Sequence, residues 1–388
     1  MSGFIIPSQI KAFLLFMKGK GFQAYLVGGC VRDGLLGFTP HDWDVCTDAL
    51  PQEIQTLFPD AITYGIRHGT VTVRWQEQLI EVTTFRAEDT YTDHRRPDHV
   101  RYIQDLHSDL ARRDFTVNAI AMDAEGLLCD PFGGLRDLED GVIRAVGSAE
   151  TRFQEDALRM LRAVRFSAQL NFCIESKTQA AILTCAPLAA ALSAERVSQE
   201  LEKTLLTSHP ERVSDMISAG LLIPWITESL SENCDKLTKL IPNRIHRWCG
   251  FGLLFHSTEC LSRFRLDRKT VKICSVCSDL HGRKNRDALF WKQAIHQFGK
   301  ETAVISSEVL SAWDSADDTQ IMRSILDSGV CCTISELAIS GSDLKALGCH
   351  GKEIGTALEK ILHHVWVHPD HNNREFLLSR LREECQHG

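Results

Sequence analysis

The spacing of apolar residues changes once along this 388-residue chain, near residue 150. Before that point, residues 24–29 predict a strand followed by a turn, and 70–75 and 79–85 predict alternating strands. The short segments 119–123 and 142–146 suggest further strands. Pro7-Ser8 and Leu50-Pro51 predict helix starts, because proline is tolerated in a first helical turn. After residue 150, apolar residues recur at helical spacing, as in EDALRMLRAVRFSAQ and KEIGTALEKILHHV. The pattern therefore predicts an α/β head followed by an all-helical remainder.

Charge is distributed unevenly along the helical remainder. Residues 236–300 contain 14 Lys and Arg against 4 Asp and Glu, although the whole chain has a net charge of −8. Residues 301–388 are acidic, with 7 Lys and Arg against 14 Asp and Glu. The basic stretch predicts a phosphate-binding surface, with a solvated helix face as the alternative.

Several features indicate a reducing compartment and no membrane partner. No run of about 18 apolar residues indicates a membrane span, and the N-terminus MSGFIIPSQI lacks the basic segment of a signal peptide. The 14 cysteines are scattered, and the one CxxC, Cys274 to Cys277, has no second CxxC to complete a zinc site. We expect a cytoplasmic protein with reduced, mostly structural thiols.

The segment GGCVRDGLLGFTPHDWDVCT (28–47) predicts a metal site. Asp42 and Asp44 are separated by one residue at the start of a predicted strand, so both carboxylates face the same side. Two neighbouring carboxylates repel unless a cation lies between them, and Mg²⁺ prefers one or two carboxylates with phosphate oxygens and water. The glycine turn at Gly28-Gly29, with Arg32 beyond it, would let a phosphate approach the backbone.

This segment resembles the head of the class II tRNA nucleotidyltransferases, within the DNA polymerase β superfamily. The resemblance continues through four later motifs in the family's order: LARRDFTVNAIA (110–121), DPFGG (130–134), EDALRMLRAVRF (155–166) and ERVSQEL (195–201). It implies an α+β fold, with a polymerase β-like head containing a mixed sheet, then an all-α neck, body and tail. The implied domains are a catalytic head (1–147), a neck (148–205), a basic tRNA-binding body (206–300) and a tRNA-binding tail (301–388).

The resemblance also implies the reaction. Members add C, C and A to the 3′ end of tRNA without a template, from CTP and ATP, and release pyrophosphate by two-metal phosphoryl transfer. Asp42 and Asp44 would hold Mg²⁺. Superfamily members commonly have a third carboxylate on a neighbouring strand, for which Glu81 is the candidate, with an ordinary strand-surface glutamate as the alternative. The oligomeric state stays open, a homodimer included.

Residues 155–165 predict how the nucleotide is chosen. Asp156, Arg159, Arg162 and Arg165 follow one another at i+3 positions of a predicted helix, and a surface helix with i,i+3 ion pairs is the alternative. A carboxylate accepts from the exocyclic amine of cytosine or adenine, while a guanidinium donates to the ring nitrogen. Uracil and guanine offer a carbonyl and a ring N–H there, so both contacts would be mismatched.

In the resembling family, the positions of Asp156 and Arg159 have this selecting role. Gly29, Arg32, Arg113, Arg162 and Arg165 would complete the nucleotide shell. Asp114 would contact the ribose or orient an arginine. Arg263, Arg265, Arg268 and Lys269 lead the candidates for tRNA contacts, which we expect to read shape and phosphates.

Other activities stay open at the level of sequence. A-only enzymes and bacterial poly(A) polymerases share this head, and superfamily relatives also transfer nucleotides to small molecules or protein hydroxyls. Residues 86–101 resemble the loop that the family associates with switching from C to A addition, which argues against CC-only addition. The short acidic end argues against a poly(A) polymerase, and the one His-Asp pair, His41-Asp42, lies within the metal motif, so phosphohydrolase activity is not predicted.

Overall fold

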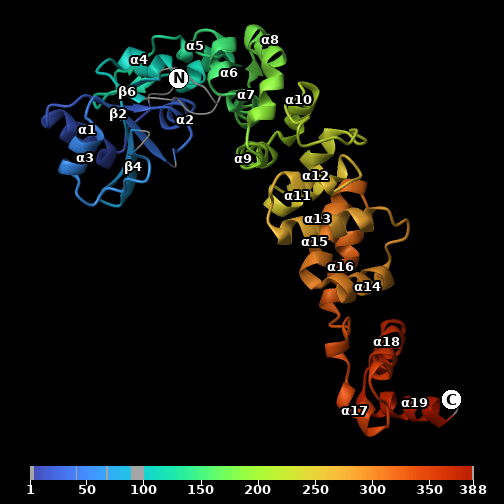
Figure 1. Ribbon diagram of the computed structural model, residues 1–388. Coiled ribbons are helices and arrows are strands. Elements are labelled where there is room, and N and C mark those ends of the chain that lie inside the picture. The colour runs from blue at the N-terminus through green and yellow to red at the C-terminus, as the bar shows by residue number, and fades with distance from the viewer. Residues whose placement is uncertain (1–3, 41, 67–68, 89–99, 387–388) are drawn as a thin grey trace. The chain divides into compact units, whose positions relative to one another are not determined.

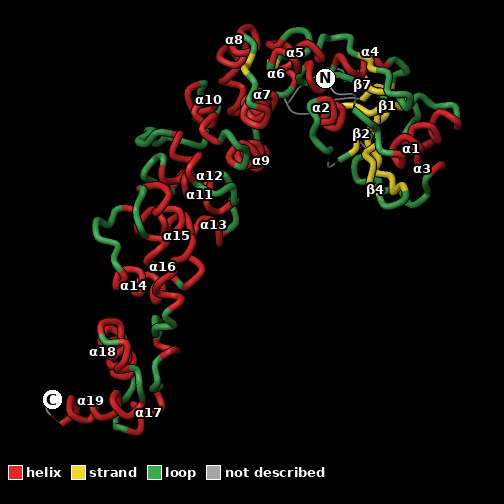
Figure 2. The backbone as a smooth tube through the Cα atoms, turned by 180° about the vertical axis from the view of Figure 1, so that it is seen from behind, coloured by secondary structure: helices red, strands yellow, loops and turns green. Residues whose placement is uncertain are grey.

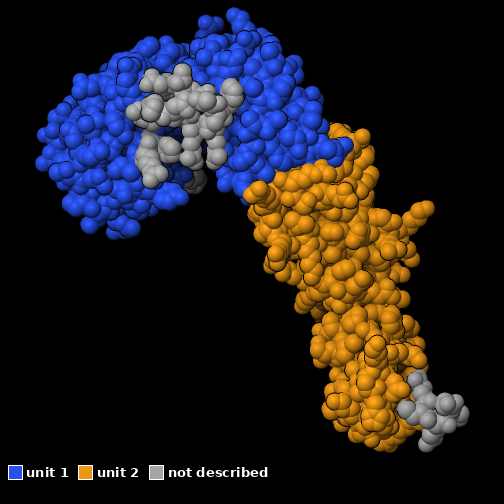
Figure 3. Space-filling model, in the orientation of Figure 1, with its two compact units in different colours: residues 1–227 blue, residues 228–388 orange. Residues whose placement is uncertain are grey.

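The chain consists of two compact units, residues 1–227 and 228–388 (Figure 3). The computed structural model describes residues 4–40, 42–66, 69–88 and 100–386 (Figure 1). Most of the loop predicted at 86–101 therefore lies outside the described residues, as does His41.

A six-stranded sheet organises the first unit, in the order β3-β4-β2-β1-β7-β8. Its strands are β1 (Ala24–Val27), β2 (Trp43–Thr47), β3 (Thr70–Trp75), β4 (Gln78–Thr84), β7 (Ala121–Met122) and β8 (Leu128–Cys129). β2 and β4 run parallel, whereas the other neighbours are antiparallel. Figure 2 shows these strands in yellow. The sheet is mixed, which confirms the predicted α+β fold class.

Helices pack on this sheet through apolar side chains. Phe13 and Phe16 of α1 (Ser8–Gly19) contact Trp75 of β3 and Phe58, which follows α3 (Pro51–Leu57). A second buried cluster joins Val27, Cys46 and Phe85 to Leu110 of α4 (Leu106–Ala111). α2 (Gly29–Leu35) follows β1, and β5 (Arg86–Glu88) pairs with β6 (Val100–Tyr102).

Most predicted elements are confirmed. The strands at 24–27, 70–75 and 78–84 match the strands predicted within 24–29, 70–75 and 79–85, and α1 and α3 begin at the two proline signals. The segment 142–146 is different, because β9 (Val142–Ile143) lies outside the main sheet and pairs with β10 (Cys173–Ile174).

The rest of the first unit is largely helical. α5 (Gly134–Asp140) is followed by α6 (Ala149–Glu155), α7 (Leu158–Leu170), α8 (Ser176–Cys185), α9 (Ala194–Leu205) and α10 (Val213–Ser218). The prediction of one continuous helix from residue 155 is wrong. Asp156 has an extended backbone, with φ −140° and ψ 104°, and separates α6 from α7. α7 packs against α9.

The regular elements in the described part of the second unit are helices (Figure 1). They are α11 (Arg244–Leu253), α12 (Glu259–Arg263), α13 (Arg268–His281), α14 (Ala288–Phe298), α15 (Lys300–Asp314), α16 (Asp318–Asp327), α17 (Gly341–Ala346), α18 (Lys352–Val367) and α19 (Arg374–Gln386). Trp248, Phe251 and Phe264 form an aromatic cluster, and Leu344, Leu362 and Leu377 belong to a second core.

The structure divides the chain once, after Thr227, so the four-domain division stays a prediction. Residues 206–227 lie in the first unit, and α15 packs against α11, α13 and α14 across the boundary predicted at residue 300. Within the described residues, no helix is long and apolar enough to cross a membrane.

Candidate active site

A glycine turn connects β1 to α2. Gly28 has φ 76°, a backbone conformation that L side chains rarely adopt. A Cβ atom on Gly28 would stand 3.6 Å from both Arg113 Nη1 and Asp44 Oδ2, and one on Gly29 would stand 3.7 Å from Arg32 Nη2. The turn therefore places the backbone close to the predicted metal ligand Asp44 and to the predicted nucleotide-binding residues Arg32 and Arg113.

Three carboxylates gather where the start of β2 lies beside the middle of β4. Asp44 lies directly opposite Glu81 in the parallel pairing, and the exposed Asp42 immediately precedes β2. Burial raises the pKa of Asp44 to about 6, the negative charges of Glu81 and Asp42 add to the rise, and Arg113 opposes it. The pairing places Glu81 where a third carboxylate was expected.

The carboxylates of Asp42, Asp44 and Glu81 are ligands of the kind that a hard divalent cation prefers. Negative oxygens that repel one another gain most from a cation between them, and carboxylate oxygen is the donor that Mg²⁺ prefers. In the part of the chain that the structure describes, no three His, Cys, Asp or Glu side chains are arranged to hold a metal ion as they stand. Waters or substrate phosphates would have to complete the coordination, which is the usual way of holding Mg²⁺.

The buried Asp109 holds Arg113 beside these carboxylates. Asp109 accepts from Arg113 Nη2 at 3.1 Å and from Arg112 Nη2 at 2.8 Å. Burial raises the pKa of Asp109, but the charges of both arginines outweigh it and lower the pKa below its usual value. Arg113 Nε is buried and has no partner among the described residues, so this side chain retains an unused donor.

Asp114 connects two further predicted arginines. It accepts from Arg162 Nε at 2.8 Å and Nη2 at 2.6 Å, and from Asn118 Nδ2 at 3.2 Å. Asn118 Oδ1 in turn accepts from Arg32 Nη1 at 2.7 Å. Burial raises the pKa of Asp114, but the charge and hydrogen bonds of Arg162 dominate and hold it well below its usual range. The geometry matches the second role expected for Asp114, orienting an arginine.

The two predicted selecting residues are fixed by different partners. Asp156 Oδ1 accepts from Leu158 N at 3.1 Å, and Oδ2 accepts from Arg196 Nη2 at 2.8 Å. Arg159 donates to Glu155 Oε2 at 2.6 Å and to the Arg112 carbonyl at 3.0 Å. Asp156 therefore stands before helix α7 rather than on it, whereas Arg159 lies in its first turn.

Arg165 points elsewhere. Its guanidinium donates to Glu200 Oε2 at 2.5 Å and to Gln169 Oε1 at 3.0 Å, and both members of the Arg165–Glu200 pair are buried. The Phe166 ring lies 3.9 Å from the Arg165 guanidinium carbon, 5.0 Å from that of Arg32 and 5.2 Å from that of Arg162. Phe166 thus gathers three of the predicted arginines by cation–π contacts.

Sequence reasoning assigned no role to several of these partners. Arg196 and Glu200 stand within the quoted motif ERVSQEL, and Asp109 precedes the motif LARRDFTVNAIA. Glu200 is almost fully buried in the helix α9, which has a strongly apolar face. A charged residue at an apolar helix position is the signal that could have identified it.

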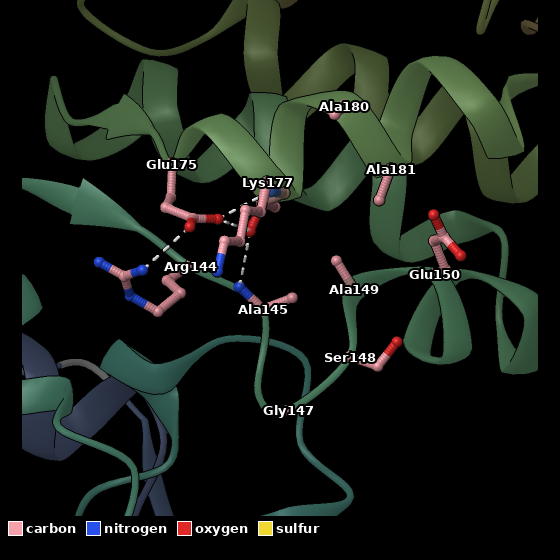
Figure 4. A pocket seen from close by; sticks show the side chains of 11 residues that line it. Arg144, Ala145, Gly147, Ser148, Ala149, Glu150, Glu175, Lys177, Ala180 and Ala181 are labelled. Atoms are coloured by element: carbon pink, nitrogen blue, oxygen red, sulfur yellow. Dashed lines mark hydrogen bonds and ion pairs between the residues drawn. The ribbon is translucent and has the colours of Figure 1, made fainter.

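A pocket of about 520 Å³ opens in the first unit (Figure 4). Arg144 on its wall donates to Asp137 at 3.0 Å and pairs with Glu175 at 3.0 Å, so its charge is already compensated. The predicted catalytic and nucleotide-binding residues are absent from its described lining.

The predicted tRNA-binding cations lie on α12, α13 and the turn between them. Arg263 pairs with Glu228 at 3.1 Å, and Lys269 pairs with Glu301 at 2.6 Å. Arg265, Arg268 and Lys269 are all exposed. The basic stretch is therefore partly neutralised by acids of its own unit.

The chain is similar to known proteins along its whole length. Residues 24–144 match the family model of the Poly A polymerase head domain, and residues 171–231 match the "Probable RNA and SrmB- binding site of polymerase A". The CCA-adding enzyme of Enterococcus faecalis is 36% identical over 99% of this chain and 98% of its own. That of Leuconostoc mesenteroides is 39% identical over 90% of each chain. The crystal structure of the Bacillus stearothermophilus CCA-adding enzyme in complex with CTP is 31% identical, with a TM-score of 0.84 over 99% of this chain and 100% of that one.

Proposed function

Because this chain belongs to the family of CCA-adding enzymes, we propose that it completes tRNA by adding C, C and A to the 3′ end. The substrates are CTP, ATP and tRNA. In each step the terminal hydroxyl oxygen of the RNA forms a bond to the α-phosphorus, and the bond to the β-phosphate bridge breaks with release of pyrophosphate. Full-length similarity to enzymes of this one name carries the conclusion, and none of these relatives supports A-only addition or a poly(A) polymerase.

Family membership implies a divalent metal ion, and we propose that Mg²⁺ is the ion used. Asp42 and Asp44 would hold it, and Glu81, opposite Asp44 in the sheet, is proposed as the third carboxylate. The bound ion supplies charge neutralisation for the triphosphate and a lower pKa for the RNA hydroxyl. The absence of side chains at Gly28 and Gly29 would let the triphosphate approach the backbone of this turn.

We propose that Asp156 and Arg159 choose the nucleotide. Two oxygens of a carboxylate offer about four acceptor positions, so Asp156 can take a base amine while it keeps Leu158 N and Arg196. Arg159 is anchored to Glu155 and to the Arg112 carbonyl, next to the segment that carries Arg113. Anchoring of both groups favours selection, because rigid partners reject a base with the opposite donor pattern.

Gly29, Arg32, Arg113 and Arg162 are proposed to contact the nucleotide, on two supporting observations. Arg113 has an unused buried donor beside Asp44, and Arg32 and Arg162 are linked through Asn118 and Asp114. Arg165 also belongs to this shell in our proposal, as a support behind Phe166, because its guanidinium is paired with Glu200.

The helical parts are proposed to bind tRNA through its shape and phosphates, and a cytoplasmic location is proposed from the family's substrate. Arg265, Arg268 and Lys269 are the first candidates for phosphate contacts, because all three are exposed on the basic stretch.

Incubation with tRNA lacking its 3′ end tests the proposed activity. CTP alone should extend the RNA by two residues, CTP with ATP by three, and ATP alone should not extend it. Addition of A to tRNA ending in CC, without addition of C to the shorter tRNA, would instead identify an A-only enzyme.

A further inference from the structure

The main sheet has one face that carries the proposed metal carboxylates. Residues directly opposite each other on neighbouring strands point to the same face, and side chains alternate along each strand. Thr72 of β3 is paired with Glu81 of β4, and Glu81 is paired with Asp44 of β2, so all three lie on one face. Val73 and Ile80 are fully buried on the other face. We call the face of Asp44, Glu81 and Thr72 the carboxylate face.

The carboxylate face continues beyond Glu81 without cover from the described residues. Arg74 and Leu79 are directly opposite each other, two residues along their strands from Thr72 and Glu81. Ile62 extends the face on its outer side, because an antiparallel bridge pairs it with Thr72. Arg74 is exposed, and Leu79 and Ile62 are 51% and 52% exposed. These four residues, Ile62, Thr72, Arg74 and Leu79, form what we call the open face.

Arg74 is a cation without a counter-charge on the open face. Its guanidinium has no hydrogen bond or ion pair with any residue that the structure describes. Arg74 and Glu81 are diagonal neighbours, which lie about 7–8 Å apart and within reach of long side chains, yet no ion pair joins them. Arg113 and Arg162 of the proposed nucleotide shell are each paired with an acid instead. Arg74 is therefore available to an external anion beside the carboxylates.

The order of the strands decides which substrate reaches the open face. β1 lies on one side of β2, whereas β4 and β3 lie on the other. Gly28 and Gly29 follow β1, so the proposed triphosphate site lies on the β1 side of Asp44. In phosphoryl transfer the attacking and leaving oxygens are roughly in line through the phosphorus. The attacking RNA hydroxyl must therefore approach from the opposite side, over β4 and β3.

We propose that the open face binds the 3′-terminal nucleotide of the RNA, an inference that rests on the proposed function. Arg74 binds the phosphate that joins this nucleotide to the preceding one, because a guanidinium forms two parallel charge-assisted hydrogen bonds with phosphate. Leu79 lies between Arg74 and the carboxylates and contacts the ribose and base. Contacts to phosphate and sugar carry no base information, so the face can accept each successive end of the growing RNA.

Removal of the Arg74 charge from the full-length chain tests this proposal. Arg74→Gln keeps the side-chain stem without the charge, and Arg74→Lys keeps the charge. Lys11→Gln is the matched control, because Lys11 is an exposed cation of α1, whose Phe13 packs on Trp75 at the other face of the sheet. Addition of A to tRNA ending in CC gives kcat and the KM values for tRNA and ATP. Fluorescence anisotropy gives the affinity for the same tRNA from about 50 to 200 mM KCl, and circular dichroism checks folding.

Arg74→Gln should raise the KM for tRNA about tenfold, while kcat and the KM for ATP change less, because one charged hydrogen bond to the RNA is lost. The slope of log affinity against log[KCl] should become shallower by about 0.7, the contribution of one phosphate contact to a single strand. A merely structural role of Arg74 would not change this slope. Arg74→Lys should keep the parent's slope. Leu79→Asn should raise the KM for tRNA with the slope unchanged, because an apolar contact releases no counterions.

An unchanged KM for tRNA and an unchanged salt slope in Arg74→Gln would overturn the proposal, as would an equal change in Lys11→Gln. A dimer of the parent that Leu79→Asn dissociates, with no change in the KM for tRNA, would also overturn it and assign the open face to a second copy of the chain. Failure of the parent to extend tRNA ending in CC would refute the proposed function itself. Extension by the parent, with no effect of Arg74→Gln, would refute only this inference.

Discussion

Replacement of Asp156 by Asn separates the shape of the selecting residue from its charge. The amide can keep one oxygen toward Leu158 N or Arg196, but it then places an NH₂ group where the other carboxylate oxygen stood. That NH₂ group repels the amine of cytosine and can donate to the carbonyl that uracil presents at the same position. The variant should therefore lose preference for CTP over UTP without losing the metal site.

The size of the effect follows from one charged hydrogen bond. Such a bond contributes about 1.5–3 kcal/mol, and each 1.36 kcal/mol changes a rate ratio tenfold. Loss of the Asp156 contact should lower the CTP-to-UTP ratio of kcat/KM by roughly 10- to 150-fold. The Arg159 contact stays in place, so some discrimination by the ring nitrogen is retained.

The assay measures kcat/KM for CTP and for UTP on tRNA that lacks its 3′ end. Asp215→Asn is the matched control, because Asp215 is an aspartate of the same unit, 3.7 Å from Arg212, and has no proposed nucleotide contact. The control should keep the parent's ratio. An unchanged ratio in Asp156→Asn, with both substrates slowed equally, would refute selection by this carboxylate.

Three further changes have defined outcomes. Asp42→Ala should slow single-turnover incorporation of labelled CTP at least about a thousandfold, because metal stabilisation is worth several kcal/mol. Chelation of the parent's metal by EDTA should have the same effect until MgCl₂ is restored. Substantial residual turnover in the variant would contradict the metal assignment. Arg196→Ala should raise the KM for CTP about tenfold while kcat changes less, because one charged hydrogen bond from Arg196 orients Asp156. Arg196→Lys should restore part of the loss. An unchanged KM in Arg196→Ala would contradict a positioning role for Arg196. The pKa of Asp114 is lower in the folded chain than the unfolded value of about 3.9, so the stability that its charge contributes is present above about pH 4 and is lost as the pH falls further. Asp114→Asn should therefore be less stable than the parent at pH 7, but its melting temperature should fall less between pH 4 and pH 2. Equal acid sensitivity in both proteins would contradict this.

Local patterns predicted the head well. Alternation located β3 and β4, and the spacing of Asp42 and Asp44 placed one at the edge of β2 and the other within it. These features are encoded by neighbouring residues, because a strand's period and a proline's fixed φ act over only a few positions.

Features that depend on distant contacts were not predictable in the same way. Helical spacing continued through Asp156, but the backbone there is extended and its carboxylate pairs with Arg196, 40 residues later. The Arg165–Glu200 pair likewise joins positions 35 residues apart. A one-dimensional pattern records which residues are charged, not which of them meet.

The short segment 109–118 touches both ends of the proposed site. At one end, Asp109 holds Arg113 beside the predicted metal carboxylates. At the other end, the Arg112 carbonyl accepts from Arg159, and Asp114 accepts from Arg162. An insertion or deletion there would alter both the rate of nucleotide transfer and the choice of nucleotide. Evolution toward a different nucleotide preference is therefore constrained in this region, and we expect altered specificities to arise more readily by single substitutions in α7 or α9 than by changes of length between α4 and β7.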